Sequence, residues 1–269
     1  MPAGSFKKAE LEKIRKVAVE AAIEAGRVTL RYYRKRLEVR EKARSSLVTQ
    51  ADMKSEALIR KILTKKFPSF QFRGEEGGAN EAAASDAPMW HVDPLDGTTN
   101  FVHGFPMYCV SIGLALGQEP LVGVVHIPTL GETFHGAKGA GAMMNRAKIR
   151  VSKRVQLSEC LLTTGFAYLH KPEVISPEIE LFKRAHLEAR AVRRPGAAAI
   201  DLAYVAAGIF DGFWERNLSS WDVCAGSLLV QEAGGKVSNY VGMPATFEGR
   251  EILATNGHIH NSMTALLRN

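Results

Sequence analysis

Residues 90–101, WHVDPLDGTTNF, constrain the fold of this chain more than any other segment. Their apolar start predicts a buried strand, which we expect to end at Asp93 because Pro94 lacks the N–H that a strand ladder needs. Asp96-Gly97 then predicts a turn, and the polar residues after it predict the start of a helix. A buried strand that passes through a turn into a helix indicates a fold in which helices pack on a sheet.

The rest of the chain alternates between the two kinds of pattern. Apolar residues at three-to-four spacing predict helices, and short β-branched or apolar runs between Gly and Pro predict strands. Helices are predicted over 9–36, from the Thr49-x-x-Asp52 capping box to Pro68, and over 176–189, 198–207 and 221–233. Strands are predicted over 70–73, 90–92, 107–116, 121–127, 132–136, 161–164, 191–192 and 212–215. We expect an α+β half over 1–150 and an α/β half over 151–269, which form one compact unit with the site in the cleft between them.

Composition and charge exclude several classes of protein. The 269 residues are 46% hydrophobic and 23% charged, which excludes disordered and collagen-like chains. No apolar run approaches the ~18 residues of a membrane span, and three scattered cysteines favour a reducing compartment, so we expect a cytoplasmic protein. Residues 1–70 hold 18 Lys and Arg against 8 Asp and Glu, a net charge of +10. Solvated helix faces are the favoured interpretation of this charge, and binding to nucleic acid is the secondary one.

The turn after the first buried strand carries the main chemical signal. Asp93 and Asp96 flank a proline turn and can converge on one point, while the backbone N–H groups of Gly97 and Thr98 would lie at a helix start. Divalent cations prefer such carboxylates, and phosphate prefers such N–H donors. The alternative is an ordinary turn in which Asp96 forms the turn and Thr98 caps the helix.

Two further acidic positions extend this signal. Glu75 and Glu76 follow a short strand, although paired glutamates in a Gly-rich loop are often only solvated. Asp222 lies in the first turn of an apolar helix, where it is either a ligand or a capping carboxylate. Other phosphatase chemistries are excluded by spacing, because the chain has no Asp-x-Asp at this turn, no Arg six residues after a Cys and no P-loop.

Together these motifs resemble the inositol monophosphatase family, the Mg²⁺-dependent and lithium-sensitive phosphatases related to fructose-1,6-bisphosphatases. The resemblance rests on GEE at 74–76, WHVDPLDGTTNF at 90–101 and WDVCAG at 221–226, in the family's order and separation. LVTQAD at 47–52 and RRPGAAAIDLAYVAAG at 193–208 extend it over nearly the whole chain. It implies a layered αβαβα sandwich and two bound Mg²⁺ ions, with a weaker third.

The resemblance also implies a role for each matching residue. Glu75, Asp93 and the carbonyl of Leu95 would hold one metal, and Asp93, Asp96 and Asp222 the second. The third metal would lie near Glu75 and Glu76. Asp52 would accept a hydrogen bond from Thr98, which helps to orient the attacking water. The remaining contacts would be to the phosphate, from Gly97 and Thr98, and to the substrate alcohol, from Glu215, Gly196 and Ala198.

Elementary chemistry agrees with such a site, since two metals can activate water and neutralise the negative charge that develops on the leaving oxygen. We expect hydrolysis of myo-inositol monophosphate and related sugar or polyol phosphates by direct water attack. Alternatives with the same chemistry are histidinol phosphate, fructose 1,6-bisphosphate and a 3′-phosphonucleotide. An alternative of another class is a binding role with the transcription machinery or ribosomal RNA. The resemblance further implies a homodimer and inhibition by Li⁺.

Two positions depart from the family pattern. Ala197 stands where a hydroxyl residue is frequent, so one polar contact to the substrate is missing. His91 stands where an aliphatic residue is usual, and by strand alternation it faces the same side as Asp93. We expect His91 to be a buried, hydrogen-bonded residue rather than a ligand.

Overall fold

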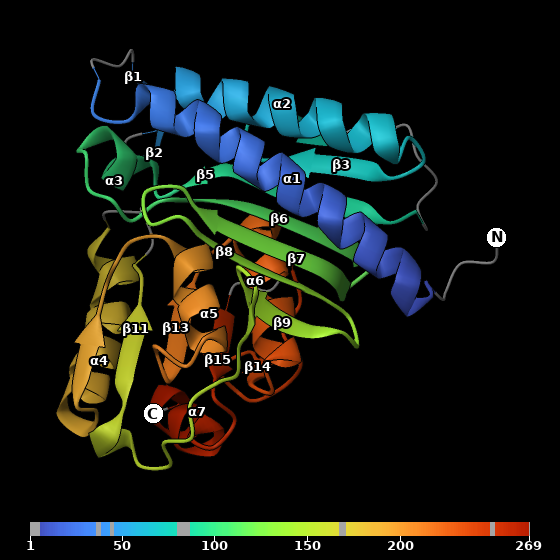
Figure 1. Ribbon diagram of the computed structural model, residues 1–269. Coiled ribbons are helices and arrows are strands. Elements are labelled where there is room, and N and C mark those ends of the chain that lie inside the picture. Colours follow the sequence, from blue (N-terminus) through green and yellow to red (C-terminus); the bar gives the residue numbers. More distant parts are fainter. Residues whose placement is uncertain are drawn as a thin grey trace.

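The chain folds into five layers in which helices and sheets alternate (Figure 1). The structure is a computed structural model that describes residues 6–35, 39–43, 46–79, 87–166, 171–247 and 251–268. In order, the layers are α1 and α2, an eight-stranded sheet, α5 and α6, a five-stranded sheet, and α4 with α7. The predicted αβαβα sandwich is confirmed.

The bounds of the described elements are as follows. The helices are α1 Lys8–Tyr32, α2 Gln50–Lys66, α3 Thr98–Val102, α4 Pro172–Glu188, α5 Ala198–Ala206, α6 Ser220–Glu232 and α7 His260–Arg268, with a 3₁₀ turn at Leu157–Glu159. The strands are β1 Val39–Ala43, β2 Ser46–Thr49, β3 Gln71–Gly74, β4 Gly78–Ala79, β5 Met89–Asp96, β6 Cys109–Leu116, β7 Glu119–Ile127, β8 Glu132–Ala137, β9 Gly141–Met144, β10 Ala147–Lys148, β11 Leu161–Thr164, β12 Ala191–Arg193, β13 Gly212–Arg216, β14 Lys236–Ser238 and β15 Glu251–Thr255.

The eight-stranded sheet runs in the order β10-β9-β8-β7-β6-β5-β3-β4 and is antiparallel except where β3 pairs with β5. Helix α1 buries the predicted stripe, including Leu11, Ile14 and Ala18, against this sheet. Helix α2 begins at the predicted capping box, in which the Asp52 carboxylate accepts the Thr49 N–H at 2.9 Å. Both helices cover the face of the sheet opposite to α6 (Figure 1).

The five-stranded sheet runs in the order β12-β11-β13-β15-β14. Its strands β11, β12 and β13 are parallel, as βαβ connections require, whereas β15 is antiparallel to both its neighbours. Helices α5 and α6 lie between the two sheets, which explains why both are buried on nearly every side. The pocket described below lies where this middle layer meets the end of β5.

Two glycines let α6 approach the large sheet closely. Gly113 and Gly123 face each other on β6 and β7. A Cβ atom on Gly113 would lie 2.5 Å from the Cys224 sulfur, and one on Gly123 would lie 2.4 Å from the Ala225 carbonyl oxygen. Real Cβ atoms essentially never make non-bonded contacts this short, so the close approach of α6 to the sheet depends on these two glycines.

Several predicted boundaries were wrong. Strand β5 does not end at Asp93 but continues past Pro94 to Asp96. A bulge makes this possible: Asp93 pairs with Ser111 and Asp96 with Cys109, so the proline falls where the ladder is already interrupted. Helix α1 ends at Tyr32 rather than at residue 36, and α4 begins at Pro172 rather than at 176. The elements that were not predicted are helix α7 and strands β1, β2, β4, β9, β10, β14 and β15.

The strands of the large sheet come from residues 71–148 and those of the small sheet from 161–255. Helix α6, from the second group, packs on both sheets, and the division of the chain at residue 150 stays a prediction. The three cysteines are free and buried. Among the helices that the structure describes, none is long and apolar enough to cross a bilayer.

Candidate active site

A pocket of about 310 Å³ opens at the end of β5, between the large sheet and the middle helices. Its walls come from the turn after β3, from β5, from the starts of α3, α5 and α6, and from the end of β13. The predicted site residues that line it are Glu75, Asp93, Leu95, Asp96, Gly97, Thr98, Gly196, Ala198, Glu215 and Asp222, whereas Asp52 and Glu76 do not. Residues separated by up to 147 positions are therefore brought together.

The bulge in β5 places two carboxylates on the pocket. Asp93 is 3% exposed, and its Oδ1 accepts the Leu95 N–H at 2.8 Å across the proline turn. Asp96 accepts the Ala199 N–H at 2.7 Å, which joins β5 to the first turn of α5. In each case one carboxylate oxygen is held by the backbone, which fixes the direction in which the other one points.

Asp222 both caps α6 and lines the pocket. Its Oδ2 accepts the Ser219 N–H at 2.6 Å in a capping box, so the capping interpretation of this residue is correct. The same carboxylate lies on the pocket wall with Asp93 and Asp96. The two interpretations are compatible, because capping uses one oxygen and orients the side chain.

The turn that carries Glu75 is held from below by a residue that the sequence did not indicate. Glu56 of α2 is 4% exposed and accepts the Glu76 N–H at 2.8 Å. Gly74 makes room for it, since a Cβ atom there would lie 2.3 Å from the Glu56 carboxylate. Glu75 lines the pocket, but Glu76 is not among the lining residues.

The electrostatics of the pocket are dominated by crowded, buried carboxylates. Burial raises the pKa of Asp93 and Asp222 well above the usual 3.8, and the charges of neighbouring carboxylates raise it further. Burial raises the pKa of Asp96 to about 7, although the hydrogen bond from Ala199 acts in the opposite direction. Carboxylates that repel one another in this way need a compensating positive charge to ionise.

This set of donors suits a divalent cation. The available groups are carboxylate oxygens and the Leu95 carbonyl, which are the hard ligands that Mg²⁺ prefers. In the part of the chain that the structure describes, no three acidic, histidine or cysteine side chains already surround one point.

Asp52 lies beneath the pocket, fully buried, and contacts it through Thr98. The expected hydrogen bond is present: the Thr98 hydroxyl lies 3.2 Å from Asp52 Oδ1 and 3.1 Å from the Leu95 carbonyl oxygen. Gly97 precedes Thr98 with a φ of +92°, and a Cβ atom there would lie 2.9 Å from the Met107 carbonyl oxygen. The turn consequently requires glycine at this position.

The opposite end of the pocket is formed by residues of the second sheet. The Glu215 carboxylate lies directly against Gly165, where a Cβ atom would be 2.1 Å away. Burial raises the pKa of Glu215 well above 4.5, and the positive charge of Arg194 acts against this rise. Arg194 and Asn217 also line this end. The sequence did not single them out, because no local pattern marks a loop residue that folds toward a site.

His91 is buried as predicted, with 4% of its surface exposed. Its Nδ1 lies 2.9 Å from the Ser220 hydroxyl, at the first residue of α6. Burial lowers the pKa of His91 to about 4, so the ring is neutral at physiological pH. His91 does not line the pocket, which agrees with a role in packing β5 against α6.

Comparisons with known proteins agree with this geometry. The model of the inositol monophosphatase family matches residues 10–269. The inositol-1-monophosphatase of Synechocystis sp. is 42% identical, over 97% of this chain and 91% of that protein. The fructose-1,6-bisphosphatase/inositol-1-monophosphatase of Aquifex aeolicus is 39% identical, over 93% and 94%. The Nus factor SuhB of Pseudomonas aeruginosa is 40% identical, over 89% and 90%.

Solved structures show the same fold. The extragenic suppressor protein suhB of Bartonella henselae superimposes with a TM-score of 0.91 at 39% identity, over 96% of this chain and 99% of that one. The inositol monophosphatase of Anabaena gives 0.86 at 42% identity, over 96% of both chains. By its sequence, its fold and the residues gathered in its pocket, this chain belongs to the inositol monophosphatase family.

Proposed function

We propose that the protein hydrolyses myo-inositol monophosphate and related sugar or polyol phosphates in a Mg²⁺-dependent reaction. The observation that carries this proposal is the convergence of Glu75, Asp93, Asp96 and Asp222 on one pocket beside the start of α3. Four negative charges there would match two Mg²⁺ ions and leave room for a phosphate dianion. The family membership of the chain supports phosphate-ester chemistry.

Glu75, Asp93 and the Leu95 carbonyl would hold one Mg²⁺, and Asp93, Asp96 and Asp222 the second, with a third ion near Glu75 and Glu76. Bound there, Mg²⁺ supplies the positive charge that activates water and neutralises the leaving oxygen. Asp52 holds the Thr98 hydroxyl in place, and through Thr98 it orients the attacking water.

The substrate would contact two further groups of residues. The backbone N–H groups of Gly97 and Thr98 at the pocket would hold the phosphate. Glu215 would accept hydrogen bonds from hydroxyl groups of the alcohol, and Gly196 and Ala198 would form the wall beside it. The missing hydroxyl at Ala197 predicts looser selection of the alcohol than in relatives that carry one there.

A substrate panel tests this proposal. We expect phosphate release with Mg²⁺ from myo-inositol 1-phosphate to exceed that from histidinol phosphate, fructose 1,6-bisphosphate and a 3′-phosphonucleotide, and to disappear with EDTA. Malachite-green detection at equal substrate concentrations measures it. A higher kcat/KM for another member of the panel would identify that compound as the preferred substrate and would leave the proposed reaction unchanged. Activity that survives EDTA would contradict the proposal, and inhibition by Li⁺ is expected in the same assay.

We also propose a homodimer formed through an apolar surface that comprises Phe105 and Leu130. These side chains are 49% and 48% exposed. The loop of Phe105 and the turn of Leu130 are joined by a hydrogen bond from the Thr129 hydroxyl to the Pro106 carbonyl, at 2.6 Å. Solvent-exposed apolar side chains that gather in this way are typical of protein interfaces.

Phe105→Glu is expected to convert the dimer to a monomer, because it places a charge in the centre of the apolar contact. Light scattering after size-exclusion chromatography would report half the mass of the wild-type assembly. Leu187→Glu is the matched control, since Leu187 is 75% exposed but lies on α4 in the opposite outer layer. Equal masses for wild type and Phe105→Glu would contradict this interface.

A second candidate role is association with nucleic acid or the transcription machinery, as the name of the Pseudomonas relative suggests. The supporting observation is the charge on α2. Its carboxylates, Asp52 and Glu56, are buried, whereas Lys61, Lys65 and Lys66 are exposed. The outer face of this helix is therefore positive. A cytoplasmic location, which such a role requires, stays a prediction.

Replacement of Lys61, Lys65 and Lys66 by Glu is expected to abolish salt-sensitive binding of a fluorescently labelled single-stranded RNA. Each phosphate contact contributes to the salt dependence, so anisotropy at about 50 and about 200 mM salt measures the effect. Asp96→Asn serves as the control, because it should leave RNA binding intact. Unchanged binding by the triple variant would rule out this surface.

A further inference from the structure

The candidate active site has two walls that we assign to substrate contact, and they come from segments far apart in the chain. Gly97 and Thr98, at the start of α3, would hold the phosphate. Gly196 and Ala198, in the loop before α5 and at its first residue, would lie beside the alcohol. Since the phosphate is fixed at the first wall, the alcohols that fit depend on how far away the second wall lies. A residue that holds one wall against the other therefore influences specificity.

Asn100, at the third position of α3, connects these two walls. Its Nδ2 donates to the Pro195 carbonyl oxygen at 2.9 Å, in the loop before α5. It also donates to the Met107 carbonyl oxygen at 2.6 Å, in the segment before β6, and the Gly196 carbonyl oxygen lies 3.5 Å away. Carbonyl oxygens on every side require a donor, so the amide nitrogen and not the amide oxygen faces them. One side chain thus joins three segments.

The loop before α5 also packs directly on the phosphate turn. A Cβ atom on Gly97 would lie 3.3 Å from the Ala197 Cβ and 2.9 Å from the Met107 carbonyl oxygen, which is one of the two acceptors of Asn100. Gly196 bends the loop with a φ of +88°, a conformation that favours glycine. The hydrogen bonds from Asn100 therefore hold together two segments that are already in contact.

A further hydrogen bond joins the same two walls, but it involves a carboxylate that we assign to metal binding. The Ala199 N–H donates to Asp96 at 2.7 Å. Asn100, by contrast, carries no charge and does not line the pocket. Its replacement therefore releases the loop without removing a proposed metal ligand or a phosphate donor, and its effect can be measured separately from metal binding.

The loop and the first residue of α5 supply much of the pocket wall. Arg194, Gly196, Ala197 and Ala198 all line the pocket. The Arg194 guanidinium lies 5.7 Å from the centre of the Phe166 ring, which lines the pocket as well. A displacement of this loop would move several lining residues together, and none of them is one of the four carboxylates.

We propose that Asn100 is a positioning residue for the hydrolysis. Its amide holds the loop 194–197 at a fixed distance from the phosphate turn, and this distance selects the alcohol. The first half of the proposal, the holding of the loop, stands on the hydrogen bonds described above. The second half, the selection of the alcohol, rests on the proposed function, because it needs a phosphate ester in the pocket.

Kinetics of Asn100→Ala with two substrates test the second half. We expect kcat/KM for myo-inositol 1-phosphate to fall at least about tenfold, and kcat/KM for glycerol 2-phosphate to fall less than about threefold, because the smaller, acyclic alcohol reaches less far toward the loop. The Mg²⁺ concentration for half-maximal activity should stay within about twofold of the wild-type value. Equal losses for the two substrates would overturn the role in selection.

Asn100→Asp separates hydrogen-bond donation from the filling of space. Aspartate has nearly the same size as asparagine, but its ionised carboxylate only accepts hydrogen bonds and would face the Met107 and Pro195 carbonyl oxygens. We expect the same selective loss as in Asn100→Ala. A wild-type ratio of the two kcat/KM values in Asn100→Asp would overturn the proposal, because donation would then be unnecessary.

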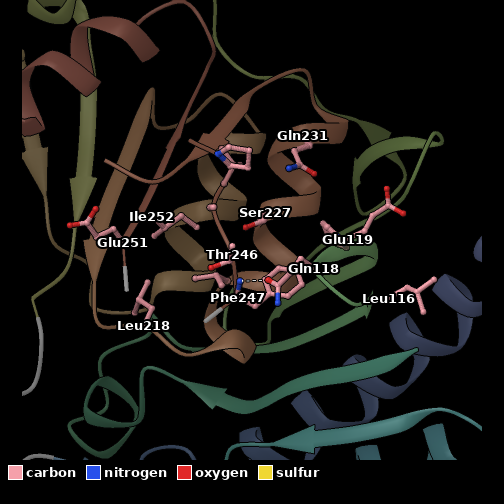
Figure 2. A pocket seen from close by; sticks show the side chains of 15 residues that line it. Leu116, Gln118, Glu119, Leu218, Ser227, Gln231, Thr246, Phe247, Glu251 and Ile252 are labelled. Carbon is pink, nitrogen blue, oxygen red and sulfur yellow. Dashed lines mark hydrogen bonds between the residues drawn. The ribbon is translucent and has the colours of Figure 1, made fainter. Parts of the chain in front are cut away.

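Gln118→Ala is the matched control, since it also removes an amide that joins two distant segments. The Gln118 side-chain oxygen accepts the Phe247 N–H at 2.7 Å, beside the cavity in Figure 2, where a dashed line marks this bond. Neither residue lines the active-site pocket. The ratio of the two kcat/KM values should equal that of the wild type. If this variant changes the ratio as Asn100→Ala does, the effect is not specific to Asn100 and the proposal is overturned.

Amide hydrogen exchange tests the first half without any assay of activity. The Asp201 N–H donates to the Ala197 carbonyl oxygen at 3.1 Å, and the Ala199 N–H donates to Asp96, so both amides depend on the position of the loop. In Asn100→Ala they should exchange at least about fivefold faster, whereas amides of β7 should exchange as in the wild type. Unchanged exchange of these two amides would overturn the first half, and so would equal acceleration throughout the chain.

Failure of this proposal can be distinguished from failure of the proposed function. A wild-type protein that hydrolyses neither substrate with Mg²⁺ would contradict the proposed function, and the role of Asn100 in selecting the alcohol would fall with it. The exchange measurement would still decide whether Asn100 holds the loop.

Discussion

Asp96→Asn is expected to lower kcat by about 1000-fold or more and to remove most of the Mg²⁺ affinity. The substitution keeps the shape and the hydrogen bond from Ala199, but it deletes a negative charge that we assign to metal binding. Steady-state kinetics and calorimetry with Mg²⁺ measure the two effects. Asp201→Asn is the control: Asp201 is an aspartate that is 1% exposed and accepts a hydrogen bond from Thr163 at 2.9 Å, but it does not line the pocket.

The same variant should be more stable than wild type in the absence of metal, and the gain should grow with pH. Burial raises the pKa of Asp96 from 3.8 to about 7, so the folded wild type binds this proton more tightly than the unfolded chain does. Wild-type stability relative to Asp96→Asn therefore falls as the pH rises from about 4 to about 7. Melting temperatures in EDTA across this range test the sign, and a difference that is constant with pH would contradict it.

Gly123→Ala is expected to destabilise the protein by about 3 kcal/mol, with a fall in Tm of roughly 10 °C. The new Cβ atom would clash with the backbone of Ala225, and a backbone, unlike a side chain, cannot relieve the clash by changing rotamer. Either β7 bends or α6 withdraws from the sheet. Withdrawal of α6 moves Asp222, so the Mg²⁺ concentration needed for half-maximal activity should also rise.

Gly131→Ala separates this effect from the loss of a glycine as such. Gly131 has a φ of +65° and open space around it, so an alanine there costs only about 1 kcal/mol of backbone strain. Its Mg²⁺ requirement should equal that of wild type. If Gly123→Ala lowers the Tm but leaves the Mg²⁺ requirement unchanged, the position of α6 does not depend on this glycine.

The parts of the fold that the sequence predicted are those with local signals. The stripe on α1 and the capping box at Thr49 and Asp52 depend on residues within one or two turns, and both are present. The passage of β5 through Pro94 could not be predicted, because it depends on pairing with Cys109 of another strand. We expected the strand to end at Asp93 because proline cannot donate a hydrogen bond to a regular ladder. At a bulge the ladder is already interrupted, so this restriction does not apply there.

The residues of the candidate site also fall into two groups, those with a local sequence signal and those without one. Glu75, Asp93, Asp96 and Asp222 stand in motifs that can be recognised one at a time, and the pocket unites them. Glu56 has no such signal, because its contact with the Glu76 N–H exists only when α2 packs beneath Gly74. Residues such as Glu56, which hold a site residue in place, are determined by packing between elements that are distant in the chain. A single sequence contains no local pattern that reveals them.

The wide separation of the four carboxylates along the chain affects how the protein matures. Glu75, Asp93 and Asp96 precede the small sheet, whereas Asp222 arrives with α6, after β13. A ribosome-bound chain that ends before residue 222 thus lacks one of the four carboxylates that we propose as ligands, and we expect the newly made enzyme to be inactive until α6 docks. Uptake of Mg²⁺ at the proposed site would accordingly follow the docking of α6, and a chelator would stop catalysis without disturbing the steps before it.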